Sequence, residues 1–423
     1  MDYRPRVVDL ELDELLGGVA AIALEGPKGV GKTATALRRA ATVHRLDDPD
    51  ERELAQADLR RLATGATPIL IDEWQRLAPV WDLVRRAVDD DGTPGRFILT
   101  GSATPGGAPV HSGAGRIVTL RMRPMALSER GLESPTVSLR RLLEGTRPAI
   151  GGSSKLQLGD YAREIVDSGL PGIRELGDRA RRAQLDGYLL RIAEREFPDL
   201  GRRLRNPAAL RRWMTAYAAA TSTTATFETI REAATGGSGE KPPRSTVQPY
   251  LETLERLWIV EPVPAWLPTR SSISRLAAPP KHQMADPALA ARLLGIGIDG
   301  LLGGRSTTPA VPRAEPLMGT LFESLVTLSV RVCAQAAEAS VMHLRTKGGE
   351  REVDLIVERD DRRVVAVEVK LGRTVSDADV RHLVWLRDQL GDDLLDAMVV
   401  TTGETAYRRP DGIAVVPAAL LGP

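Results

Sequence analysis

The fold is decided by the stretch Ala20-Ala21-Ile22-Ala23-Leu24-Glu25-Gly26-Pro27-Lys28-Gly29-Val30-Gly31-Lys32-Thr33. Its first five residues are apolar and predict a buried strand, and its last eight match G-x-x-x-x-G-K-[ST] in full. Residues 34–46 have helical spacing. Glycines between a strand and a helix let the backbone curl so that its N–H groups point inward at phosphates. The stretch therefore predicts a phosphate-binding loop.

Each position of this loop has an expected part in binding ATP with Mg²⁺. The Lys32 ammonium should reach the β- and γ-phosphates, and the Thr33 hydroxyl should be a ligand of Mg²⁺. The alternative is a glycine-rich turn that fits the pattern by chance. The residues predicted to contact the nucleotide are Gly26, Pro27, Lys28, Gly29, Val30, Gly31, Lys32, Thr33 and Ala34.

A second apolar run, Ile69-Leu70-Ile71, ends in Asp72-Glu73. A buried strand would deliver Asp72 to its carboxyl end, where the carboxylate can hold Mg²⁺ through water. Glu73 would then polarise the attacking water, which favours hydrolysis over binding alone. The alternative is an ordinary strand followed by an acidic helix start.

Three further positions are candidates for the same site. A third strand, residues 96–100, ends in hydroxyls, and Thr100 or Ser102 would sense the γ-phosphate. Arg116 precedes a fourth strand (residues 117–122), where an arginine finger is expected, and Arg174 is a candidate lid arginine. Because arginine is abundant here, surface salt bridges are an equal alternative for both.

The middle of the chain predicts helices. Residues 145–154 resemble a linker, and residues 161–200 are helical with a break at 169–172. Three helices (210–219, 227–234 and 246–257) and a strand-like run (258–263) suggest a winged helix, with Ser245 and Gln248 as a capping box. Lys241 and Arg244 suit a phosphate-contacting turn. Pro249, Glu252 and Glu255 favour packing or protein contact over DNA reading by the third helix.

The C-terminal region, beyond a Gly/Pro/Thr-rich boundary at residues 303–316, carries a second constellation. Asp354 and Glu368-Val369-Lys370 lie in a predicted strand hairpin, with Glu323 on a preceding helix. Glu368 and Lys370 share a strand face, so two carboxylates and a lysine would meet. Asp354 and Glu368 would hold Mg²⁺ for phosphodiester cleavage, with Lys370 orienting water. The alternative is a solvated hairpin with ordinary charges.

Composition bounds the class of protein. The chain has 423 residues, 42% hydrophobic and 27% charged, with net charge +1, so it gives no global basic signal for nucleic acid. The longest apolar run considered, residues 19–24, is too short to span a membrane. The single cysteine, Cys333, excludes an internal disulfide and predicts a buried thiol. We therefore expect a cytoplasmic protein with no membrane partner.

Lysine is scarce: only seven of the 57 basic residues are lysine. A lysine retained among so many arginines suggests a position that arginine cannot fill, because the two cations differ in shape and hydration. Two of the seven, Lys32 and Lys370, have an expected catalytic part in the motifs described above.

In this order, the motifs resemble a prokaryotic family that joins an AAA-type P-loop ATPase to the domain of unknown function 4143. The likeness rests on the loop, on Ile71-Asp72-Glu73-Trp74-Gln75, on residues 97–102 and 169–171, and on Thr346-Lys347-Gly348-Gly349 leading to the Asp354 and Glu368 motifs. It implies an α/β fold with a parallel-sheet AAA core (residues 1–130), a linker and helical lid (131–205), a winged-helix domain (206–300) and a PD-(D/E)xK nuclease-like domain (310–423).

The leading functional hypothesis is an Mg²⁺-dependent ATPase whose nucleotide state controls a nuclease-like domain acting on DNA or RNA. The second is an ATP-driven switch that binds a partner protein and carries the C-terminal region as an inert scaffold. A third is phosphorylation of a small molecule, which Glu73 beside Asp72 argues against. A homo-oligomer is compatible with all three.

Overall fold

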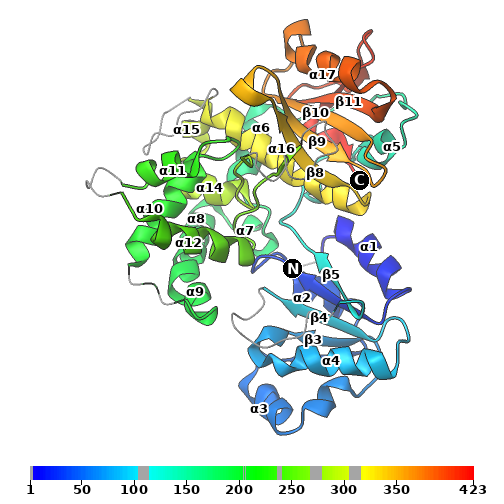
Figure 1. Ribbon diagram of the computed structural model, residues 1–423, viewed down its shortest axis with the longest axis vertical. Coiled ribbons are helices and arrows are strands. Elements are labelled where there is room, and N and C mark those ends of the chain that lie inside the picture. Colours follow the sequence, from blue (N-terminus) through cyan, green and yellow to red (C-terminus); the bar gives the residue numbers. More distant parts are fainter. Residues whose placement is uncertain are drawn as a thin grey trace.

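The computed structural model describes residues 3–102, 114–202, 204, 206–235, 241–266, 279–303 and 316–423. Figure 1 shows an N-terminal sheet in blue and cyan at the bottom, a C-terminal sheet in orange and red at the top, and green helices beside them. A continuous set of buried apolar side chains runs through all three parts. The two predicted sites therefore belong to regions that share one core.

The N-terminal sheet has five parallel strands in the order β2-β3-β4-β1-β5. Its central strands are fully or almost fully buried, as expected for a parallel sheet covered on both faces. The strands are β1 (Ala21–Glu25), β2 (Thr42–Arg45), β3 (Ile69–Asp72), β4 (Phe97–Gly101) and β5 (Ile117–Arg121). The helices of this region are α1 (Val7–Leu16), α2 (Lys32–Leu37), α3 (Pro49–Ala57) and α4 (Pro79–Asp90), with single turns η1 (Leu59–Ala63) and η2 (Trp74–Leu77).

The helix predicted over residues 34–46 is wrong in its second half. Helix α2 ends at Leu37, and β2 follows at Thr42–Arg45, paired with β3. Thr42 and Val43 are β-branched and suit a strand. The side chains of β2 alternate between half-buried and exposed, which is the pattern of an edge strand and overlaps a helical pattern over so few residues.

The segment after β5 is mostly helical. The predicted linker at residues 145–154 contains no helix. The predicted break at residues 169–172 is only partly correct, because the gap between α6 and α7 covers residues 167–170 and α7 begins at Pro171. The elements are η3 (Leu127–Glu129), β6 (Val137–Ser138), α5 (Leu139–Leu143), α6 (Leu158–Val166), α7 (Pro171–Arg174), α8 (Asp178–Arg191), the π-helical turn η4 (Ile192–Glu196) and α9 (Phe197–Asp199).

Three helices form the next segment, α10 (Pro207–Ala219), α11 (Phe227–Ala233) and α12 (Arg244–Arg256). A narrow antiparallel ribbon follows, in which Val260 pairs with Met284 and Val263 with Lys281. Helices α14 (Pro287–Leu293) and α15 (Ile298–Leu302) come next. The ribbon brings Lys281 against the C-terminal region, which matters for the second site.

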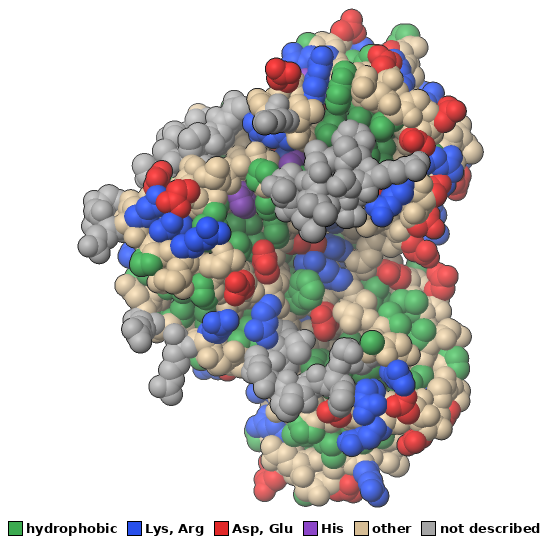
Figure 2. Space-filling view, viewed as in Figure 1, with side chains coloured by type: hydrophobic (Ala, Val, Ile, Leu, Met, Phe, Trp, Pro, Cys, Tyr) green, Lys and Arg blue, Asp and Glu red, His purple; other side chains and the backbone are tan. Residues whose placement is uncertain are grey.

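The predicted capping box of the third helix is wrong. Helix α12 begins at Arg244, after Pro243, with no side-chain cap. Ser245 is therefore already inside the helix, because proline presets the extended backbone before the first turn. Lys241 is paired with Glu228 and Glu232, so its charge is partly balanced within the segment. In Figure 2, acidic and basic side chains lie interspersed over most of the visible described surface.

The C-terminal sheet has seven strands in the order β12-β13-β11-β10-β9-β8-β7. Strand β9 pairs antiparallel with both β8 and β10, and β12 pairs antiparallel with β13. The pairs β7–β8, β10–β11 and β11–β13 are parallel. The elements are β7 (Ala265–Trp266), α16 (Leu317–Ala336), β8 (Ser340–Arg345), η5 (Lys347–Gly349), β9 (Glu352–Glu358), β10 (Val364–Lys370), α17 (Asp377–Leu390), η6 (Gly391–Asp393), β11 (Leu394–Thr401), β12 (Tyr407–Arg408), β13 (Ala414–Pro417), η7 (Ala418–Leu420) and β14 (Leu421–Gly422).

Strand β10 shows the predicted two-faced pattern. Val365, Val367 and Val369 belong to the core that α16 shares, while Ala366 packs with α17 on the other face. Residues i and i+2 of a strand share a face, so Glu368 points to the α17 side near the strand's end. The sheet is thus held between α16 and α17.

Helix α16 is the one described helix that is long and apolar enough to cross a membrane by length and composition. A helix carrying Glu323 was expected here from the sequence, and Glu323 and Arg331 interrupt its apolar run. Its whole apolar window is buried inside the fold, so its side chains form core. The predicted buried thiol, Cys333, lies on this helix, where burial raises its pKa.

Candidate functional site

The glycine loop connects β1 to α2, and its backbone conformation requires glycine. Gly26 has φ +152°, and a Cβ there would lie 2.1 Å from the Met122 carbonyl oxygen. Gly31 has φ +105° and precedes the first residue of α2. Residues other than glycine rarely adopt such φ angles, so the glycines at these two positions allow the loop to curl. Val30 is buried beneath it, whereas Ala34 is exposed.

The Lys32 side chain lies folded into the loop. Its Nζ donates to the carbonyl oxygens of Gly26 at 2.8 Å and Pro27 at 2.9 Å, and the residue is buried. Burial lowers the pKa of Lys32 to about 8, against the opposing charges of Glu73 and Asp72. A bound phosphate would offer the ammonium a charged acceptor in place of two carbonyls.

Asp72 connects three elements at the carboxyl edge of the sheet. Its Oδ1 accepts a hydrogen bond from the Thr33 hydroxyl at 2.8 Å and another from the Thr100 hydroxyl. Thr100 lies beside it because β3 and β4 pair in that register. Carboxylate and hydroxyl oxygens are the ligands that Mg²⁺ prefers. The residues predicted to hold Mg²⁺, Thr33 and Asp72, therefore fit that ion.

Glu73 turns the chain away from β3 in a left-handed conformation, with φ +55°. Non-glycine residues in this region cost free energy and concentrate at functional sites. Its Oε2 accepts from the Gln75 amide at 2.6 Å. Glu73, Ser102 and Lys28 line a cavity of about 270 Å³. Gln75, which orients Glu73, had no predicted role in the sequence analysis.

A second cavity, of about 390 Å³, lies between the loop and the helices α7 and α8 with η4. Lys28 and Glu196 form an ion pair of 2.6 Å across it, and Tyr188 donates to the Lys28 carbonyl oxygen at 3.2 Å. Its apolar lining comes from Leu170, Ile173, Tyr188, Ile192, Leu257 and Ile259. Arg191 and Arg195 also line it, so the helical side offers both apolar surface and charge.

The structure does not bring Arg116 to this site. Arg116 lies at the amino end of β5, whereas the loop follows the carboxyl end of the parallel strand β1. It forms a 2.8 Å ion pair with Asp89, and both side chains are largely exposed. Within one chain, Arg116 therefore fits the alternative interpretation, an arginine in a surface salt bridge.

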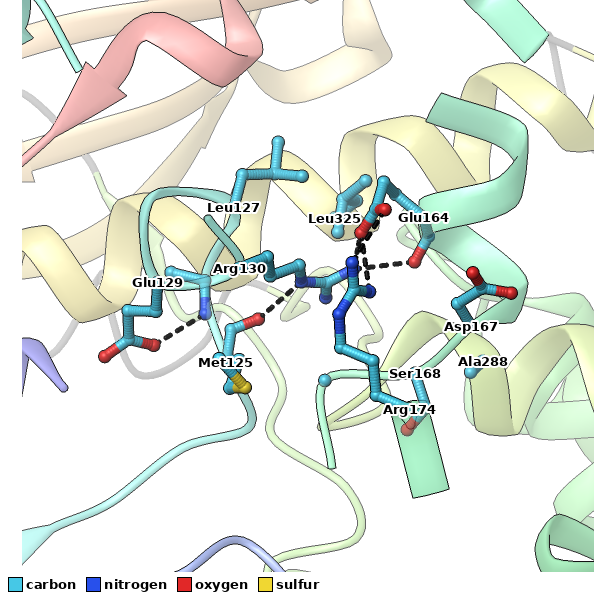
Figure 3. Close-up of polar contacts among 12 residues, drawn as sticks. Met125, Leu127, Glu129, Arg130, Glu164, Asp167, Ser168, Arg174, Ala288 and Leu325 are labelled. Atoms are coloured by element: carbon cyan, nitrogen blue, oxygen red, sulfur yellow. Dashed lines mark hydrogen bonds and ion pairs between the residues drawn. The ribbon is translucent and has the colours of Figure 1, made fainter. Parts of the chain in front are cut away.

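Arg174 is engaged in a buried network rather than free at the loop (Figure 3). Its guanidinium makes two hydrogen bonds to Glu164, of 2.7 and 2.8 Å, and buried Arg130 pairs with the same carboxylate at 2.9 Å. Burial tends to raise the pKa of Glu164, but the two guanidiniums hold it below its ordinary value. Arg174 therefore positions α7, whose Gly172 and Ile173 line the cavity.

The four residues predicted for the C-terminal site meet in one cavity of about 660 Å³. Glu323 comes from α16, Asp354 from β9, and Glu368 and Lys370 from β10. Lys370 pairs with Glu368 at 3.1 Å, and Asp354 accepts from the Val369 backbone N–H at 2.9 Å. Burial and the Asp354 charge raise the pKa of Glu368 well above its ordinary value. The predicted convergence of carboxylates and lysine is present.

Lys281, which had no predicted role, lies inside this cavity with only 1% of its surface exposed. Its ammonium is 2.9 Å from Glu323, 3.1 Å from Asp354 and 3.6 Å from Glu352. The scarcity of lysine, which drew attention to Lys32 and Lys370, applies equally to Lys281 and could have found it. His382, Arg345 and Arg381 also line the cavity.

A divalent ion does not fit between Asp354 and Glu368 as these side chains stand. No group of three His, Cys, Asp or Glu residues in the described part of the chain has a metal-holding arrangement. The Lys281 ammonium already contacts the Asp354 oxygen that would face the ion. The expectation that Asp354 and Glu368 hold Mg²⁺ is therefore not met by this geometry.

Comparison with known families divides the chain into three segments. Residues 19–130 match a family described as an AAA domain, residues 158–299 match the domain of unknown function 8612, and residues 318–421 match the domain of unknown function 4143. The chain is also 26% identical over 406 residues to uncharacterized proteins of Mycobacterium bovis and Mycobacterium tuberculosis, covering 94% of this chain and 80% of theirs.

Two solved structures resemble the chain distantly. A Walker-type ATPase of Pyrococcus abyssi is 18% identical with a TM-score of 0.39, covering 69% of this chain and 99% of its own. The ORC2 protein of Aeropyrum pernix, solved as ADPNP–ADP complexes, is 15% identical with a TM-score of 0.28, covering 71% and 95%.

Proposed function

Because this chain joins an AAA-type P-loop ATPase domain to a domain of unknown function 4143, we propose that it binds ATP with Mg²⁺ at the glycine loop and hydrolyses it. The proposal rests on one observation. The hydroxyls of Thr33 and Thr100 both donate hydrogen bonds to Asp72, directly beside the loop that holds Lys32. The triphosphate would lie along the loop amides. The ion would supply charge neutralisation between the β- and γ-phosphates.

Hydrolysis, rather than binding alone, is supported by Glu73. This carboxylate follows Asp72, lines the cavity beside Lys28 and Ser102, and is oriented by Gln75. A carboxylate so placed can accept a proton from an attacking water. Phosphate release without any added acceptor would exclude transfer to a small molecule.

The nucleotide state would control the C-terminal cavity, which we propose to bind nucleic acid. Lys370, Arg345 and Arg381 line that cavity and offer cations to a phosphate backbone. The test is purified protein incubated with ATP, Mg²⁺ and mixed DNA and RNA, following phosphate release and strand scission together. Scission that Asp354→Ala abolishes, with ATP hydrolysis retained, would support a nuclease.

Lys281 favours a second candidate function, an ATP-driven switch that binds a partner protein and keeps the C-terminal region as an inert scaffold. An ammonium among the carboxylates balances their charge without any ion from solvent. This function predicts phosphate release with no metal-dependent cutting by the wild type in the same incubation. Metal-dependent scission would exclude it.

A further inference from the structure

The C-terminal cavity contains a cation supplied by the protein itself. Lys281 Nζ is hydrogen-bonded to one oxygen each of Glu323 and Asp354, and Glu352 lies 3.6 Å away. The two oxygens accept from the same nitrogen, so they face one point in the cavity. Removing a charge from water at such a point is costly unless it is paired, and here it is paired with carboxylates from α16 and β9.

A further carboxylate oxygen beside this point lacks a partner. Glu368 is 4% exposed, and its Oε1 accepts no hydrogen bond from any described residue. His382 Nδ1 lies 4.0 Å from that oxygen, beyond hydrogen-bond distance. Buried polar atoms are nearly always satisfied, so an orphan of this kind points to a ligand.

The geometry points to a divalent-cation site made of Glu323, Asp354 and Glu368 that Lys281 holds closed. Mg²⁺ and Ca²⁺ bind oxygens at about 2.0–2.6 Å, so an ion cannot share the point that the ammonium occupies at 2.9 and 3.1 Å. Lys281 supplies one positive charge in its place. With the ammonium withdrawn, three carboxyl groups would border an empty position that a divalent cation would stabilise.

The position of Lys281 depends on the ribbon that carries it. Lys281 exchanges backbone hydrogen bonds with Val263 at 2.9 and 2.8 Å. Two residues before Val263, Glu261 is half-buried and pairs with Arg121 at 2.7 Å, and Arg121 stands opposite Glu25 in the sheet register. Glu25 is the residue before the glycine loop. The ribbon therefore contacts both the strand end beside the nucleotide site and the acidic cavity.

This inference deepens the proposed role of the C-terminal region but does not require ATP hydrolysis, so its test omits nucleotide. The experiment measures Mn²⁺ binding by calorimetry in an Asp72→Asn background, which removes the carboxylate of the first site. Wild-type Lys281 and the charge-retaining Lys281→Arg should bind no ion at the cavity. Lys281→Met should gain one Mn²⁺ per chain, and adding Asp354→Asn to it should abolish that gain.

Thermal unfolding supplies a second measurement. Without its ammonium, Lys281→Met should unfold at a lower temperature in EDTA, because like charges face one another, and Mn²⁺ should restore much of that loss. Folded Lys281→Met that binds no additional ion would overturn the proposal. So would Asp354-dependent Mn²⁺ binding by the wild type.

If Lys281→Met does not fold, crystals of the wild type soaked in Mn²⁺ decide the question. Anomalous scattering should then be absent between Glu323 and Asp354. A manganese peak beside an undisplaced Lys281 would show that the lysine does not close the site.

Discussion

Lys28 of the glycine loop and Glu196 of the π-helical turn η4 form a 2.6 Å ion pair across the cavity between the loop and the helices. Turns of this type are uncommon and often occur at functional sites. The pair directs the Lys28 ammonium away from the phosphates that the loop amides would bind. It also places a carboxylate close to an expected polyanion.

Replacing Glu196 by glutamine should strengthen ATP binding. The change removes a negative charge near the triphosphate and releases Lys28, so the dissociation constant should fall about 2- to 5-fold at low salt. The gain should shrink at about 0.5 M salt, because screening weakens charge interactions. Fluorescent-nucleotide titration measures it. Glu194→Gln, on the exposed side of the same turn, is the matched control.

Lys32→Ala should abolish ATP hydrolysis while leaving the fold intact. The ammonium is the group expected to reach the β- and γ-phosphates, and in the structure it donates to two loop carbonyl oxygens. Burial already disfavours its charge, so the free energy of unfolding should change by about 1 kcal/mol. Phosphate release and thermal unfolding measure the two effects. Hydrolysis near the wild-type rate would contradict the assigned role.

Glu73→Gln should bind ATP normally and turn it over about 10²- to 10⁴-fold more slowly, the range typical of a lost general base. Glutamine has the same shape and can keep the contact with Gln75. Single-turnover phosphate release, with nucleotide affinity measured separately, distinguishes binding from chemistry. Gln75→Ala should slow turnover less, because it only orients the carboxylate. Near-normal turnover by Glu73→Gln would remove this residue as the base.

Much of the N-terminal fold was predictable because its signals are local. The apolar run that ends at Asp72 is a strand in the structure, and the glycine loop stands between a strand and a helix. The resemblance to an AAA-type ATPase joined to the domain of unknown function 4143 is confirmed. Strand β2 was missed because it has only four residues, too few for its two-residue period to be distinguished from a helical pattern.

The parts of the sites that could not be predicted depend on contacts between distant segments. Lys281 lies 73 residues before Asp354, and only the pairing of the ribbon brings the two together. Arginines could not be ranked from sequence, because many occur: Arg116 proved to pair with Asp89 and Arg174 with Glu164. Glu368 and Lys370 were predictable because strand alternation fixes which side chains share a face. Asp354 was predictable because the hairpin folds β9 back beside β10.

Glu368→Gln should stabilise the protein at neutral and alkaline pH. Burial and the Asp354 charge raise the pKa of Glu368, so the folded protein holds a proton there that the unfolded chain loses above about pH 4.5. Stability therefore falls as pH rises from that value to the raised pKa, by about 1.4 kcal/mol per pH unit, and is constant beyond it. The glutamine side chain does not titrate in this range, so Glu368→Gln avoids this loss of stability.

The difference in unfolding temperature between Glu368→Gln and the wild type should thus be small near pH 4.5 and widen toward pH 8. Calorimetric scans across this range measure it. Glu404→Gln removes a carboxylate from an exposed ion pair with Arg373, and its difference should change little with pH because surface pairs contribute little. A Glu368→Gln protein that is less stable than the wild type at pH 8 would mean that the Lys370 ion pair outweighs the cost of burying the carboxylate.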